Sequence, residues 1–266
     1  MRAEDPIPHP EDQIIVKRSS TPENLGPLRG QVWLTIQTHQ ARQLVRGRDG
    51  TADKPPIIGL VGFADRLRLI WQAARNEDPY ADWWLIKVHE AIEATGETLR
   101  NWQSDMDDLL IRPSAMDISI AESQQPFRMP LQFANPYAYQ GAHLLSAYDR
   151  LVCRVLTAGH IGLLDDATRR GLIQLGARKI RATFLIPQGY RFLKLDRASV
   201  RETTGRSQEA RQLMGELPDD VLNGERQAPI APRKVKFPQG FVSQVELQPE
   251  SPVSNQNHSE AKNHNR

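Results

Sequence analysis

Two dipeptides, Asp78-Pro79 and Asn135-Pro136, open the two longest stretches of helical periodicity in this 266-residue chain. Aspartate and asparagine accept hydrogen bonds from the unpaired N–H groups at a helix N-terminus, and proline suits the first helical position. The first stretch runs towards Arg112, with Gly96 as a candidate break, and the second continues to about residue 156. These features predict a fold built around long helices.

The segment before residue 76 has a different pattern. Apolar and polar residues alternate over 31–37, which is typical of a half-buried strand. Thr38 is a suitable cap for a short helix over 38–47, and apolar residues at three- and four-residue spacing predict another helix over 57–75. The N-terminal order is therefore strand, helix, helix.

Two more alternating segments lie in the middle of the chain, at 116–123 and 127–133. We expect them to pair as a central β-hairpin, with Pro130 placing the second strand at a sheet edge. The alternative is that 31–37 is an ordinary strand that pairs inside the domain with 127–133.

The predicted fold class is α+β and mainly α-helical, with the N-terminal strand-helix-helix, the central β-hairpin and a C-terminal helical region. The C-terminal helices are expected over 166–186 and 197–214, and Asp165 is expected to cap the first of them. One domain is expected over 28–232. Residues 1–27 and 233–266 are polar or proline-rich with little to bury, so they are expected to be disordered tails.

Charge is divided unevenly along the chain, although the net charge is only +2. Residues 76–123 contain eleven acidic and three basic residues, whereas residues 169–211 contain eleven basic and three acidic ones. The two regions either face each other, or the basic region contacts phosphates, whose binding weakens steeply with salt. The sequence leaves both interpretations open.

Catalytic and metal-binding patterns are weak. None of the seven histidines has a metal-ligand spacing, and His89-Glu90 lacks the second histidine of a zinc-protease helix. The single cysteine, Cys153, sits among apolar residues and suits a reducing cytoplasm. No apolar run approaches a membrane span. We therefore expect a cytoplasmic protein that is not an enzyme, with no cofactor, no metal and no membrane contact.

Four segments combine turn residues with aromatic or aliphatic anchors: GQVWLTIQTHQARQL at 30–44, DPYADWW at 78–84, PLQFANPYAYQGAHLL at 130–145 and MGELPDDVLNGERQAPIAP at 214–232. Together they resemble a family of proteins carried by bacterial integrating conjugative elements, related to the AcaB-like transcriptional regulators of conjugative plasmids. The resemblance covers roughly residues 28–232. It implies DNA-binding regulation with a ribbon-helix-helix module, for which the candidate here is 28–76.

In such a module two chains pair their strands, so the resemblance implies a homodimer bound to double-stranded DNA. The ribbon enters the major groove and its outward side chains read bases. A second candidate ribbon is 127–133, with Arg128 and Gln132 outward. For the first candidate, the predicted base-reading residues are Trp33, Thr35 and Gln37, although Trp33 suits a base edge poorly. The predicted phosphate contacts are Arg42, Arg46, Arg48, Arg178, Lys179, Arg181, Arg197 and Arg201.

Two functions remain open from the sequence. The first is a DNA-binding accessory protein of an integrating conjugative element that regulates element genes. The second is a non-catalytic scaffold for other proteins of the transfer machinery, which would use the aromatic segments at 78–84 and 133–139. The tyrosines near Pro136 are also explained by simple packing.

Overall fold

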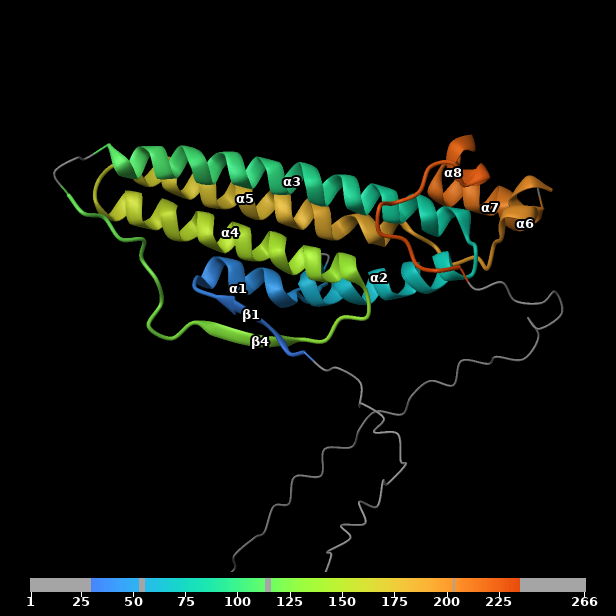
Figure 1. Cartoon of the computed structure of the whole chain (residues 1–266), viewed down its shortest axis with the longest axis horizontal. Helices are drawn as coiled ribbons and strands as arrows, with labels where there is room; N and C mark the ends of the chain where they lie inside the picture. The colour runs from blue at the N-terminus through green and yellow to red at the C-terminus, as the bar shows by residue number, and fades with distance from the viewer. Residues whose placement is uncertain (1–29, 53–55, 113–115, 203, 235–266) are drawn as a thin grey trace, which may run out of the picture.

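The computed structural model describes residues 30–52, 56–112, 116–202 and 204–234. Three long helices, α3, α4 and α5, lie side by side, with α1 and α2 against α4 and three short helices at one end (Figure 1). In chain order the elements are β1 (Val32–Ile36), α1 (His39–Arg46), β2 (Gly47–Arg48), β3 (Ile57–Ile58), α2 (Leu60–Arg75), α3 (Pro79–Ile111), β4 (Phe127–Leu131), α4 (Pro136–His160), α5 (Asp166–Leu185), the 3-10 helix η1 (Ile186–Gly189), α6 (Arg197–Arg201), α7 (Gly205–Met214) and α8 (Asp219–Asn223).

Side-chain caps begin the three long helices, as the sequence predicts. Asp78 accepts hydrogen bonds from the first-turn N–H groups of α3, and Asn135 and Asp165 do the same for α4 and α5. The candidate break at Gly96 is wrong, because α3 is continuous from Pro79 to Ile111. A glycine inside a helix costs only about 1 kcal/mol, and the buried apolar face of α3 on either side of Gly96 offsets that cost.

The core lies where the long helices meet α2. Phe63 of α2 stacks on Phe184 of α5, with ring centroids 4.8 Å apart. Tyr148 of α4 is fully buried, and its ring lies where a Cβ on Gly176 would approach within 2.7 Å. Only glycine allows α5 to pack this closely on α4, so the backbone spacing of these two helices depends on one residue.

The β-structure differs from the predicted hairpin. Segment 116–123 forms no strand, and β4 pairs antiparallel with β1 instead, in the register Val32–Leu131 to Ile36–Phe127. The alternative pairing of 31–37 with 127–133 is therefore confirmed. Segment 116–123 crosses α4, where the Ala121 N–H donates to Thr157 Oγ1, a contact that replaces a strand partner. The N-terminal order of one strand and two helices is confirmed for β1, α1 and α2. The start of the second helix at 57 is wrong, because Ile57–Ile58 forms β3, which pairs with β2.

The C-terminal region is more broken than predicted. A single helix over 197–214 is wrong, because α6 ends at Arg201 and α7 begins at Gly205. The physical reason is that Thr204 caps a new helix by accepting from the Ser207 N–H. The predicted tails fall almost entirely outside the described residues.

Candidate nucleic-acid interface

The β1–β4 ribbon lies at the surface, below α1 in Figure 1. Its inner face is set by Leu34 and Ile36, which are buried, because alternate residues of a strand point to opposite faces. On the outer face of β1, Trp33 is 47% exposed and Thr35 is half-buried. The outward positions predicted from alternation, Trp33 and Thr35, are thus where the sequence places them.

Strand β4 supplies the other half of this outer face. Pro130 pairs with Trp33 and Arg128 pairs with Thr35, and both β4 residues are exposed. The Arg128 guanidinium carbon lies 5.2 Å from the centroid of the Trp33 ring, so the cation covers the indole. The two segments that compete as candidate ribbons in the sequence form one ribbon in the structure.

Gln37 is held at the base of the ribbon. Its N–H donates to Asp149 Oδ2 at 2.7 Å, and its side-chain oxygen accepts from the Ser123 N–H at 3.0 Å. Asp149 of α4 is buried and also accepts from the N–H and the hydroxyl of Thr38, at 2.9 and 2.6 Å. One carboxylate therefore fixes the junction between β1 and α1.

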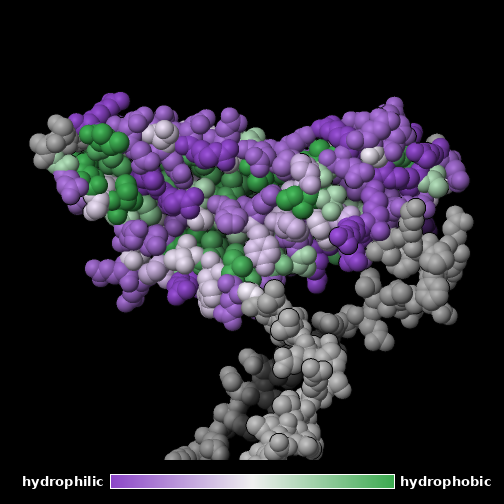
Figure 2. Space-filling model, viewed as in Figure 1, coloured by the Kyte–Doolittle hydropathy of each residue, from purple (hydrophilic) through white to green (hydrophobic). Residues whose placement is uncertain are grey.

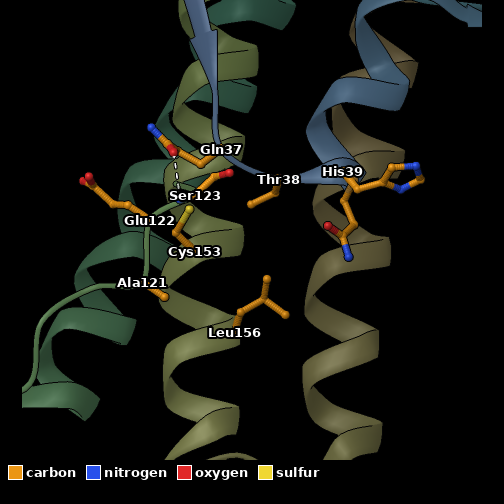
Figure 3. Close-up of a pocket in the computed structure, with 9 residues that line it drawn as sticks. Gln37, Thr38, His39, Ala121, Glu122, Ser123, Cys153 and Leu156 are labelled. Carbon is orange, nitrogen blue, oxygen red and sulfur yellow. Dashed lines mark hydrogen bonds between the residues drawn. The ribbon is translucent and has the colours of Figure 1, made fainter. Parts of the chain in front are cut away.

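A cavity of about 290 Å³ opens beside this junction (Figure 3). Residues 37–40, the crossing segment 121–123 and two α4 side chains, Cys153 and Leu156, line it. Burial, together with the nearby Asp149 and Glu122 charges, raises the pKa of the Cys153 thiol to about 11. At neutral pH the thiol is protonated, which agrees with a structural role rather than a nucleophilic one.

Three of the predicted phosphate contacts, Arg42, Arg46 and Arg48, follow β1 closely in sequence and lie on α1 and β2. Arg42 of α1 is exposed, and its guanidinium carbon lies 5.2 Å from the ring centroid of Phe127 in β4. Arg46 is exposed in the last turn of α1, and Arg48 is exposed in β2. The contact between Arg42 and Phe127 places one cation directly at the ribbon.

The four segments of family resemblance are supported by comparison with known proteins. Residues 24–234 match the sequence profile described as "Transcriptional regulator AcaB", which is most of the chain. This chain belongs to the AcaB family of transcriptional regulators. The family is one of regulators, not of enzymes. No curated protein matches.

One solved structure agrees with the family assignment at the level of fold. It is the crystal structure of selenomethionine-containing AcaB from uropathogenic E. coli, with a TM-score of 0.51 and 15% sequence identity. The match covers 73% of this chain and 94% of the other. At that identity the likeness supports the fold of this AcaB-family regulator alone.

The predicted basic residues of α5 lie away from the ribbon strands in sequence but on a helix that packs against α1. Arg178 and Lys179 are exposed. Arg181 is half-buried, and its Nε is buried without a hydrogen-bond partner. Only the first two are fully presented to solvent.

At the other end of the molecule, Arg197 is engaged inside the fold. It forms an ion pair with the buried Asp82 and donates to the carbonyl oxygens of Val221 and Leu222. Asp82 also accepts from Lys234 Nζ at 3.1 Å. Arg201 remains exposed and donates to Asn223 Oδ1 at 3.2 Å.

Ion pairing between the acidic and basic regions is limited. Across the described residues, the Arg197–Asp82 pair is the single ion pair that joins 76–123 to 169–211. Asp107 and Glu90 of α3 pair instead with Arg154 and Arg226, which lie outside the predicted basic region. Most of the basic region is therefore not neutralised by the acidic one.

The aromatic segments proposed as docking surfaces are mainly core. Tyr137 and Tyr148 are fully buried and Tyr139 is partly buried against the core, which confirms the interpretation of the tyrosines near Pro136 as a packing cluster. Tyr80 is also fully buried, and Trp84 is nearly so. Lys87 Nζ lies 3.3 Å from the ring centroid of the half-buried Trp83. A partner that docks on these aromatic rings would have to displace the core.

A buried acid, Asp78, belongs to the same region. It accepts a hydrogen bond from the Tyr190 hydroxyl at 2.6 Å while capping α3. Burial raises the pKa of Asp78 to about 6, against the opposing effect of the Tyr190 hydrogen bond. The carboxyl is thus poised to titrate below neutral pH.

The remaining surface offers few other sites. Figure 2 shows a mainly hydrophilic face with an apolar patch where α3 ends, at the left; exposed apolar residues near that end of the bundle are Ile111, Met116 and Ile161. Within the described ranges, no three histidine, cysteine, aspartate or glutamate side chains could hold a metal ion. None of the described helices is both long and apolar enough to span a membrane.

Arg128 is not among the base-reading residues predicted for the first candidate ribbon, 31–37. Arg128 belongs to the outer face because β4 pairs with β1. The alternation of 127–133 places Arg128 outward on that strand, but the sequence offers the pairing with 31–37 only as one of two alternatives.

Proposed function

We propose that this AcaB-family regulator binds double-stranded DNA through the outer face of the β1–β4 ribbon, and that it controls genes of an integrating conjugative element. The observation that carries the proposal is that exposed Trp33 and half-buried Thr35 pair with exposed Pro130 and Arg128 on one face. β-Ribbon proteins place their strands in either groove of DNA, and a major groove about 12 Å wide admits such a ribbon directly.

The donors of this face give it chemistry for bases. Arg128 offers a guanidinium, and Thr35 offers a hydroxyl. The side-chain oxygen of Gln37 is already bonded to the Ser123 N–H, and Figure 3 shows its amide nitrogen pointing away from the cavity. Gln37 is therefore expected to donate to a base acceptor rather than to bind adenine with both of its side-chain atoms.

Phosphate contacts extend the interface beyond the ribbon. Arg42, Arg46 and Arg48 are exposed on α1 and β2. On α5, Arg178 and Lys179 provide a second exposed basic surface, with Arg181 half-buried beside them. We leave Arg197 out of the proposed interface, because its guanidinium is already engaged by Asp82 and two carbonyl groups.

A homodimer fits the strand-helix-helix order of β1, α1 and α2. In the described part of the chain, β1 has one strand neighbour, β4. The proposed dimer pairs the other edge of β1 with the β1 of a second copy. Antiparallel pairing of two copies would give a four-stranded surface with two-fold symmetry. Sedimentation of the purified chain, with and without DNA, tests this arrangement.

The test of DNA reading is fluorescence-anisotropy titration with fragments of the element's promoters beside an unrelated fragment. Thr35→Ala and Gln37→Ala should each reduce the preference for the bound fragment about threefold to tenfold, since a single hydrogen bond to a base is worth at most the lower end of the about 1–3 kcal/mol of a bidentate contact. Gln212→Ala, an exposed change on α7, is the control.

An unchanged preference in both ribbon variants would contradict base reading by this face. No binding to any fragment at low salt would overturn DNA binding altogether. A protein-interaction role would then be the next hypothesis, and the apolar end near Ile111 would be the first surface to test.

A further inference from the structure

We infer that the ribbon binds the minor groove of A·T-rich DNA and that Trp33, backed by Pro130, enters a base step as an apolar wedge that kinks the duplex. The inference rests on the proposed function, because it requires the ribbon to contact DNA. It adds the groove, the base composition and the deformation of the target.

The first step in the argument is the place of Trp33. It lies on the outer face of β1, 47% exposed, opposite the exposed Pro130. An indole offers one N–H and a proline side chain offers no hydrogen-bonding group. Trp33 and Pro130 are more exposed than the half-buried Thr35, so this part of the outer face presents an apolar ridge to the bases.

An apolar ridge has a known use in DNA binding. Side chains of this kind enter between base pairs from the minor groove, partly unstack them and bend the duplex away. The ring face that Arg128 does not cover adds a flat surface on which a base can stack. A ribbon that only read base edges in the major groove would gain little from a large ring on its outer face.

The second step is the polarity of the groups around the ridge. The Arg128 side chain has only donors. Gln37 has its side-chain oxygen bonded to the Ser123 N–H, so its amide nitrogen is left to donate. In the minor groove, A·T and T·A pairs present only acceptors, whereas a G·C pair adds a donor. The Thr35 hydroxyl can donate or accept, whereas the groups of Arg128 and Gln37 can only donate. These fixed donors match A·T pairs and conflict with the guanine amino group.

The third step is the charge beside the wedge. The Arg128 guanidinium lies over the Trp33 ring, with 5.2 Å between its central carbon and the ring centroid. Stretches of A·T pairs narrow the minor groove and strengthen its negative potential, which attracts arginine. Trp33 and Arg128 thus enter the groove as one unit.

The first experiment identifies the groove. In the tightest promoter fragment, A·T pairs are replaced either by inosine–cytosine pairs, which keep the A·T minor-groove pattern and change the major groove, or by G·C pairs. We expect the inosine fragment to bind within about twofold of the original and the G·C fragment to bind about tenfold more weakly. Equal weakening by both replacements would overturn the minor-groove assignment.

The second experiment detects the wedge. 2-Aminopurine placed at successive steps of the site reports unstacking, and donor and acceptor dyes at the fragment ends report bending. Wild-type protein should raise 2-aminopurine emission at one step and bring the ends closer. Trp33→Ala should abolish both signals and weaken binding about tenfold, while Trp33→Phe should keep part of each.

Phe192→Ala is the matched control, since Phe192 is 52% exposed and lies outside the ribbon. Thermal unfolding of all variants separates loss of fold from loss of contact, and the partial activity of Trp33→Phe keeps the test informative if Trp33→Ala unfolds. Normal binding with straight, stacked DNA would overturn this inference alone. Absence of binding to any fragment would overturn the proposed function and this inference together.

Discussion

The ribbon and the C-terminal helices both carry arginines, but they use them differently. At the ribbon, Arg42 and Arg128 lie over the rings of Phe127 and Trp33 and stay exposed. At the other end, Arg197 is held by the carboxylate of Asp82 and by carbonyl groups of α8. An aromatic ring positions an arginine and leaves its positive charge available to a partner. A buried carboxylate forms an ion pair that neutralises this charge.

This difference separates arginines that stabilise the fold from arginines that remain able to bind a partner. A basic stretch in the sequence contains both kinds. The acceptors that surround each guanidinium in the folded chain decide which kind it is, and mutations can test that distinction directly.

The largest expected effect is at the C-terminal end. Arg197→Ala should lower the free energy of unfolding by about 3–5 kcal/mol, because it leaves the buried Asp82 carboxylate without its main partner. Urea denaturation checks this value. The exposed Arg201→Ala serves as control and should stay within about 0.5 kcal/mol of wild type. Equal small effects would mean that Arg197 is as available to phosphates as Arg201.

The next effect depends on pH. The folded pKa of Asp78 is raised from 3.8 to about 6, so its contribution to stability is greatest below about pH 4 and is lost as pH rises through 6. Relative to Asp78→Asn, wild type should therefore lose up to about 3 kcal/mol of unfolding free energy between pH 4 and pH 7. Chemical denaturation of both proteins across this range measures the change. A difference that does not vary with pH would contradict a buried, titrating Asp78.

A smaller effect is expected where the ribbon joins α1. Asp149→Ala removes the acceptor of two N–H groups and of the Thr38 hydroxyl. Unsatisfied buried donors should cost about 2 kcal/mol of stability. Because Gln37 is one of the donors, base preference in the anisotropy assay should fall as well. Loss of stability with intact base preference would show that the junction does not position the DNA-reading residues.

The smallest effect on stability is expected on α5. The double change Arg178→Ala and Lys179→Ala should leave unfolding unaffected, because both side chains are exposed. If they contact phosphates, the slope of log affinity against log salt should fall by about 1 for each residue. An unchanged slope would remove α5 from the interface and leave phosphate binding to α1 and the ribbon.

Local chemistry was enough to predict much of the fold. Asp78, Asn135 and Asp165 cap their helices through atoms two or three residues away, so sequence spacing alone reveals them. The predicted hairpin failed because 116–123 and 127–133 alternate equally well. Which of the two segments forms a strand depends on partners that are distant in sequence. For 116–123, the Ala121 N–H bonds to Thr157 instead of to a neighbouring strand.

The candidate site shows the same division. Alternation predicted the outward positions of Trp33 and Thr35, since they need only the period of a strand. The role of Arg197 was hidden, because Asp82 is 115 residues away in sequence. Arg128 could be placed beside Trp33 only after β4 was known to pair with β1.

The most direct test of the proposed interface is amide hydrogen exchange of the full chain with and without a bound promoter fragment. The ribbon hypothesis predicts that added DNA slows exchange over 31–37 and 127–133, with weaker protection over α1 and no change over α8. Protection confined to 169–214, with the ribbon unchanged, would contradict the assignment of DNA binding to the β1–β4 surface.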